Sequence, residues 1–86
     1  MQSKSIQNTH TMEKIVELIM KNDGLDETEA KLKANLLYIK LNQAEIKDYH
    51  DEFIEWLMTE KKLNYKAILQ TSDHQLHDMY ISEFKR

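Results

Sequence analysis

The chain has 86 residues with one glycine, no proline, no cysteine and a net charge of −3, a length that suits one small domain. Tight β-turns need glycine and proline, whereas Leu, Ile, Ala, Glu, Lys and Gln are abundant here and favour helices, so we expect an all-α fold. Without cysteine there is no disulfide framework and no cysteine-based zinc site, as is typical of cytoplasmic proteins.

The first ten residues are polar, and we predict that 1–10 form a flexible N-terminal tail before a single helical domain over 11–86. This segment lacks the apolar centre of a signal peptide. No other segment approaches the roughly 20 apolar residues that span a bilayer. We therefore expect a cytoplasmic location and no contact with a membrane.

The spacing of apolar residues predicts a compact bundle of four to five short helices, near 11–22, 26–41, 43–61, 64–70 and 73–84. Gly24 should take the left-handed conformation that closes the first helix. Asp26 with Glu29, and Ser72 with Gln75, have the spacing of capping boxes at the starts of later helices. Asn42 with Glu45 has the same spacing, which favours a break near 41–43 over one long helix paired with its copy.

The second predicted helix is apolar on two sides. One stripe consists of Leu25, Leu32, Leu36 and Ile39, and the other of Ala30, Ala34, Leu37 and Leu41. Such a helix is either a central core helix or one that carries an oligomer seam. We assign the candidate seam of a homodimer to the stripe with the alanines, although burial in the core is the more common role for such a stripe.

The third predicted helix, 43–61, is apolar on one side and acidic on the other. Six carboxylates lie from Glu45 to Glu60, opposed in that span only by Lys47. Like charges four residues apart each cost a helix about 0.2–0.5 kcal/mol, so folding does not require this face. The candidate partner-binding residues, which would dock a basic protein, are Glu45, Asp48, Asp51, Glu52, Glu55 and Trp56. The alternative is a solvated face that lysines of another helix, such as Lys31 or Lys33, neutralise.

No catalytic motif is present: there is no cysteine nucleophile, no G-x-S-x-G and no glycine-rich phosphate loop. We therefore predict no enzyme, no catalytic residue and no cofactor. His74, His77 and Asp78 share one helix face, but a surface histidine pair is more common than a metal site with this spacing, and we predict no metal. His50 lies beside apolar residues and should be partly buried with a hydrogen-bond partner.

Together these features predict a small accessory or regulatory protein that acts by protein–protein interaction, as an inhibitor, adaptor or assembly factor. Its size and its Lys-, Asn- and Ile-rich composition are typical of phage or mobile-element proteins. The alternatives are a helix-turn-helix DNA-binding regulator and a dimeric helical structural or assembly protein. Nucleic acid is not an expected partner, because the excess charge is negative and Asp26, Glu27 and Glu29 occupy the start of the second helix.

Overall fold

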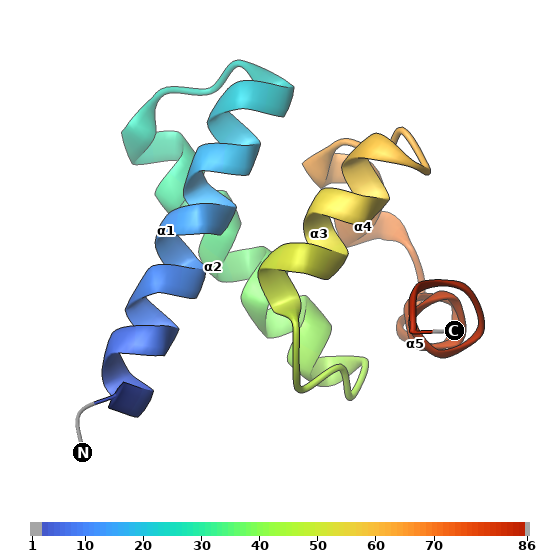
Figure 1. Ribbon diagram of the computed structural model, residues 1–86. Coiled ribbons are helices and arrows are strands. Elements are labelled where there is room, and N and C mark those ends of the chain that lie inside the picture. The colour runs from blue at the N-terminus through green and yellow to red at the C-terminus, as the bar shows by residue number, and fades with distance from the viewer. Residues whose placement is uncertain (1–2, 86) are drawn as a thin grey trace.

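Five α-helices and a closing π-helical turn make up the computed structural model, which describes residues 3–85, with side chains from residue 11 onward. They are α1 (Ser3–Asp23), α2 (Glu27–Gln43), α3 (His50–Thr59), α4 (Tyr65–Gln70), α5 (Asp73–Met79) and the turn η1 (Tyr80–Phe84). The predicted all-α bundle is confirmed. α1 and α2 form a helical hairpin, and the chain then crosses to α3, α4 and α5 (Figure 1). No helix in the described range is both long and apolar enough to cross a membrane.

The turn between α1 and α2 follows the sequence prediction. Gly24 has φ +71°, and its N–H donates to the Met20 carbonyl at 3.0 Å. Glycine adopts this left-handed conformation without the steric penalty of a Cβ atom. Asp26 then caps α2 by accepting a hydrogen bond from the Glu29 N–H at 2.9 Å. α1 begins at Ser3 and not near residue 11, so the helix extends through most of the predicted tail, and residues 1–2 lie outside the described range.

The hydrophobic core lies where α1, α2 and α3 meet, and α4 and α5 also pack against α2. Its largest fully buried side chains are Ile15, Ile19, Leu37, Leu41, Ile46, Phe53, Ile54, Leu57, Ile68 and Leu76. Burial of one such side chain contributes about 1.5–3 kcal/mol, so this set supplies the main driving force for folding.

The two apolar stripes of α2 have different surroundings. Ala30, Ala34, Leu37 and Leu41 are all fully buried within one chain. Their assignment as an oligomer seam therefore does not fit the structure, because side chains already enclosed by their own chain are not free to contact a second copy. Their alternative interpretation, as core residues, agrees with the observed burial. Three members of the other stripe, Leu32, Leu36 and Ile39, are 56%, 46% and 50% exposed, whereas Leu25 is partly buried against the core.

α2 ends in a Schellman motif and does not continue into α3. The Ile46 N–H donates to the Leu41 carbonyl at 2.9 Å, and the Glu45 N–H donates to the Asn42 carbonyl at 3.0 Å. Ile46 and Leu41 are both fully buried, which adds the apolar contact that accompanies this motif. Glu45 has φ +62°, in the place that glycine usually takes. The predicted break after the second helix is thus confirmed.

The third helix is shorter than the predicted 43–61, and its predicted start is wrong. Because Ile46 folds back to close α2, residues 44–49 form a loop and α3 begins only at His50. A helix over 43–61 would place Tyr49 on its apolar side with Ile46 and Phe53, but Tyr49 lies just before α3 with φ +59° and is 54% exposed. Glu45 and Asp48 therefore project from a loop and not from a helix face.

α5 and η1 together form the helix predicted over 73–84, which widens into a π-helical turn at its end. The turn places Tyr80 and Phe84 against α3, with ring centres 5.2 and 5.3 Å from that of Phe53. Trp56 stacks on Phe53 at 5.8 Å, and the Lys61 Nζ lies 5.6 Å from the Trp56 ring centre. Trp56 is therefore largely committed to packing α3 against the C-terminal turn.

Replacing Glu45 by glycine should raise the free energy of unfolding by about 0.5–1 kcal/mol, because the left-handed conformation strains every residue with a Cβ atom. Urea unfolding followed by the fluorescence of Trp56, the single tryptophan, measures the change.

The matched control is Glu52→Gly, which introduces the same substitution at an exposed position inside α3. There glycine should lower stability by about 1 kcal/mol. Destabilisation by Glu45→Gly of the same size as in the control would contradict the strained conformation of Glu45.

Candidate functional site

The loop 44–49 and the outer side of α3 together form what we call the acidic surface: Glu45, Asp48, Tyr49, Asp51, Glu52 and Glu55. Four of its carboxylate side chains are exposed, and that of Asp51 is half-buried. The loop lies beyond the end of α2, next to the start of α3 (Figure 1). Trp56, the sixth residue predicted to bind a partner, is half-buried at the border of this surface.

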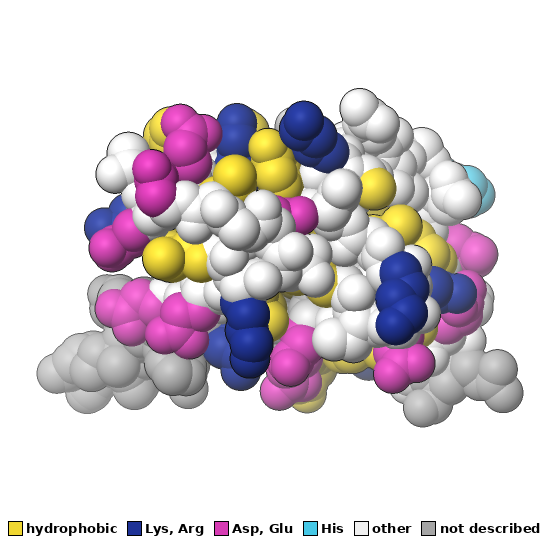
Figure 2. Space-filling model, turned by 90° about the horizontal axis from the view of Figure 1, so that it is seen from above, with side chains coloured by type: hydrophobic (Ala, Val, Ile, Leu, Met, Phe, Trp, Pro, Cys, Tyr) yellow, Lys and Arg dark blue, Asp and Glu magenta, His cyan; other side chains and the backbone are white. Residues whose placement is uncertain are grey.

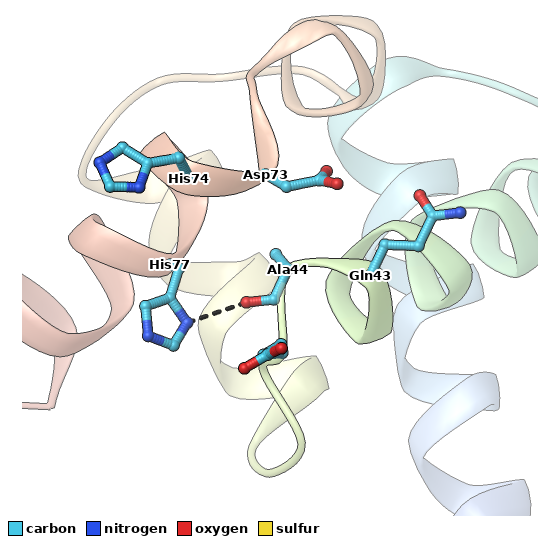
Figure 3. A pocket seen from close by; sticks show the side chains of 6 residues that line it. Gln43, Ala44, Asp73, His74 and His77 are labelled. Atoms are coloured by element: carbon cyan, nitrogen blue, oxygen red, sulfur yellow. Dashed lines mark hydrogen bonds between the residues drawn. The ribbon is translucent and has the colours of Figure 1, made fainter.

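Three side chains hold the backbone of the loop. The Nδ1–H of His77 in α5 donates to the Ala44 carbonyl at 2.8 Å (Figure 3). The Nε2–H of His50 donates to the Ile46 carbonyl at 2.6 Å, and the Tyr80 hydroxyl donates to the Asp48 carbonyl at 3.2 Å. Because a carbonyl only accepts, each histidine carries a proton on the nitrogen that faces it. Every second carbonyl from Ala44 to Asp48 is thereby held.

His50 is the most enclosed of these donors. It is 8% exposed, and its ring meets the Tyr38 ring edge-on, with ring centres 5.0 Å apart. The expectation of a buried histidine with a hydrogen-bond partner is confirmed. His50 thus connects the start of α3 to both the loop and α2.

The carboxylates of the acidic surface have no cationic partner within 4 Å among the described side chains. The two lysines expected to neutralise them are engaged elsewhere. Lys31 pairs with Glu27 at 3.3 Å, and the Lys33 Nζ lies 5.7 Å from the centre of the Tyr65 ring. Lys31 and Lys33, named in the alternative of a solvated face, therefore do not neutralise these carboxylates, and a solvated face stays the alternative. On the face drawn in Figure 2, by contrast, lysines and carboxylates lie near one another.

Besides donating a hydrogen bond to the loop, the Tyr80 hydroxyl has a pKa that the charges of loop residues affect. Burial raises the pKa of the Tyr80 hydroxyl, and the negative charges of Asp48 and of ionised Tyr49 raise it further. Asp48 and Tyr49 are consecutive residues of the loop, and both are exposed.

An open hollow of about 220 Å³ lies between the loop and α5, lined by Gln43, Ala44, Glu45, Asp73, His74 and His77. Two of the polar side chains that line it already have partners in the chain: Asp73 forms an ion pair with Lys40 at 2.9 Å, and His77 donates its hydrogen bond to the loop. The His74 ring points away from Asp73 (Figure 3).

The histidine group singled out in the sequence is divided in the structure. His74 is exposed, His77 is half-buried against the loop, and Asp78 accepts a hydrogen bond from Ser82 at 3.4 Å. Within residues 11–85, no three His, Asp or Glu side chains gather closely enough to hold a metal ion.

Tyr80 should make the fold sensitive to alkaline pH. Its raised pKa means that the folded chain keeps the hydroxyl proton to a higher pH than the unfolded chain does. The resulting stabilisation is complete below about pH 10, the ordinary pKa of tyrosine, and disappears as the pH rises through the raised pKa. Tyr80→Phe should therefore flatten the fall of the thermal midpoint above pH 10.

At neutral pH the same variant should be about 0.5–1.5 kcal/mol less stable, because it loses the hydrogen bond to Asp48. Both effects are measured by the thermal midpoints of wild type, Tyr80→Phe and the control Tyr65→Phe. The pH is varied from about 7 to about 11, which includes the ordinary tyrosine pKa. An alkaline slope in Tyr80→Phe as steep as in wild type would contradict the role of Tyr80.

The chain has no detectable relative in three comparisons with known proteins: no family model matches it, and no curated protein or solved structure matches it significantly. Its functional interpretation therefore rests on the residues and geometry described above.

Proposed function

We propose that this chain is a non-enzymatic accessory or regulatory protein and that its acidic surface binds a basic protein partner. The observation that carries this proposal is the half-exposed Tyr49 lying among carboxylates that have no ion-pair partner in the described part of the chain. Tyrosine is enriched at protein interfaces, where its ring contributes apolar contact and its hydroxyl a hydrogen bond. Unpaired carboxylates around it complement the lysines and arginines of a partner.

The loop is held in shape without a partner, which supports a binding role. Hydrogen bonds from three other residues fix its carbonyls, so little backbone freedom remains to be lost on binding. Both Glu45 and Tyr49 occupy left-handed conformations that disfavour side chains. The chain thus keeps a carboxylate and an aromatic ring where glycine would fold more easily, and strained positions of this kind are common in binding loops.

Arginine is the partner side chain that this surface suits best. A guanidinium group stacks on an aromatic ring and also donates two hydrogen bonds to one carboxylate. Tyr49 and Asp48 are consecutive in the chain and offer an exposed ring and an exposed carboxylate. Lysine would gain the charge interaction without the planar contact.

The DNA-binding alternative has less support. Glu27 and Glu29 lie in the first turn of α2, and Asp73 lies in the first turn of α5. These are the helix ends that a helix-turn-helix protein directs at the phosphate backbone, where carboxylates are repelled.

Charge reversal tests the proposal with an oligoarginine peptide as the probe. Asp48→Lys with Glu52→Lys should weaken binding at least about tenfold, because two attractive charges become repulsive. Calorimetric titration at two salt concentrations measures the affinity, and wild-type binding should weaken at high salt.

The control is Glu13→Lys with Glu17→Lys, which makes the same change of net charge at two exposed positions of α1. It should retain most of the wild-type affinity. Equal losses in both double variants would mean that net charge alone attracts the peptide, which contradicts a defined binding surface.

The same three proteins can then serve as baits for the cellular partner. A basic protein retained by wild type and by the α1 control, but released by the loop variant, is the expected result. Identical retention by all three baits would contradict the assignment of the acidic surface.

A further inference from the structure

A groove between α1 and α3 opens beside the acidic surface. It has a volume of about 230 Å³ and is lined by Leu18, Lys21, Asn22, Glu55, Met58 and Thr59. We call it the α1–α3 groove. Sites that enclose a small-molecule ligand usually have roughly 300–1,000 Å³, so this groove is better suited to a single side chain of a larger partner.

The more buried side chains of the α1–α3 groove are apolar. Met58 is only 5% exposed, and Leu18 is partly buried against the core. The four polar side chains that line the groove are all exposed. Apolar contact below and polar groups around it are the features of pockets that receive an anchoring side chain at a protein interface. The flexible thioether of methionine also adapts readily to the shape of an incoming group.

The α1–α3 groove continues the acidic surface along α3. Asp51, Glu55 and Met58 are four and then three residues apart, which places them on one side of the helix. Glu55 belongs to both features, because it is the last residue of the acidic surface and also lines the groove. A partner bound to the acidic surface therefore reaches the groove without leaving α3.

The charges beside the α1–α3 groove favour a neutral occupant. Glu55 and Lys21 lie on its two helices, and neither has an ion-pair partner within 4 Å among the described side chains. Lys21 would repel an arginine or lysine that entered the groove, and Glu55 would repel a carboxylate. The Thr59 hydroxyl already donates to the Glu55 carbonyl at 2.8 Å. An aliphatic side chain avoids both repulsions and can contact Leu18 and Met58.

We infer that the α1–α3 groove holds an aliphatic side chain, such as leucine, of the same basic partner that binds the acidic surface. This inference rests on the proposed function and adds an apolar anchor to the basic segment that the partner must carry. Tyr49 caps α3, and Met58 follows it by nine positions, which is about 14 Å along the helix axis. An extended chain covers this distance in about four residues. The anchor should therefore lie about four residues from the arginine that stacks on Tyr49.

Two peptides of equal charge test the inference. One has a single leucine between two runs of about four arginines, which lets it reach Tyr49 in either chain direction, and the other has serine in place of the leucine. In calorimetric titration, wild type should bind the leucine peptide about tenfold more tightly, because its leucine leaves water for an apolar site. With methionine methyl groups labelled for NMR, the leucine peptide should shift the Met58 signal, and the serine peptide should not.

Filling the groove from its own edge provides the matched variant. Thr59→Phe adds an aromatic ring at an exposed lining position, so its affinities for the two peptides should become similar. The control is Thr28→Phe, the same substitution at an exposed position of α2 outside the groove, which should keep the preference for leucine. The comparison of the two peptides on wild type does not depend on how either variant folds.

The outcomes separate the groove from the acidic surface. Equal binding of both peptides by wild type would overturn the groove and leave the acidic surface in place. A preference for leucine that persists in a folded Thr59→Phe variant would also overturn the groove, because the leucine would then bind elsewhere, as on the exposed Leu32 and Leu36 of α2. Failure of both peptides to bind would contradict the acidic surface and the basic partner on which the inference rests.

Discussion

The hydrogen bond from the Ile46 N–H to the Leu41 carbonyl, 2.9 Å long, determines the course of the chain after α2. Without this closure the apolar spacing would also suit one helix through residues 27–59, roughly 50 Å long. That length exceeds the longest dimension of the folded molecule, 34 Å. With the closure, Ile46 enters the core, the chain reverses, and α3 packs against α1. The acidic residues, which one helix would have aligned on one face, are divided between a loop and a short helix.

This division gives the acidic surface its chemical character. A helix face would have presented carboxylates alone, with Tyr49 turned inward. The loop instead exposes Tyr49 beside Asp48, and α5 and η1 fix the loop through His77 and Tyr80. Repulsion between Asp51 and Glu55, four residues apart on α3, slightly destabilises the helix. The left-handed backbone conformation of Glu45 also costs free energy. These local penalties are small beside the burial of the core, so the fold tolerates them. The proposed binding role is the benefit that would explain them.

The helices and several of their ends could be predicted because their signals are local. Gly24 closes α1, Asp26 caps α2 through Glu29, and Ser72 caps α5 through Gln75, each within four residues along the chain. The loop could not be predicted in the same way, because 44–49 contains neither glycine nor proline. The contacts that hold it, from His77 to Ala44 and from Tyr80 to Asp48, join residues 33 and 32 positions apart.

The sequence also did not predict which of the two apolar stripes of α2 is buried. Hydrophobicity alone would bury Leu32, Leu36 and Ile39, but the structure buries the stripe that contains Ala30 and Ala34. Small side chains allow neighbouring helices to approach closely, and that packing requirement outweighs the larger apolar area of the other stripe. Which stripe is buried thus depends on the shape of the neighbouring helices, which the periodicity of a single helix does not contain.

Mapping of backbone amide chemical shifts during titration with an oligoarginine peptide tests the central claim most directly, since it locates a basic ligand residue by residue. The proposed role of the acidic surface predicts that the largest shifts fall on residues 44–49 and on the first two turns of α3, with small shifts at Glu13 and Glu17 of α1. Equal shifts at all exposed carboxylates, or shifts concentrated on α1, would contradict it.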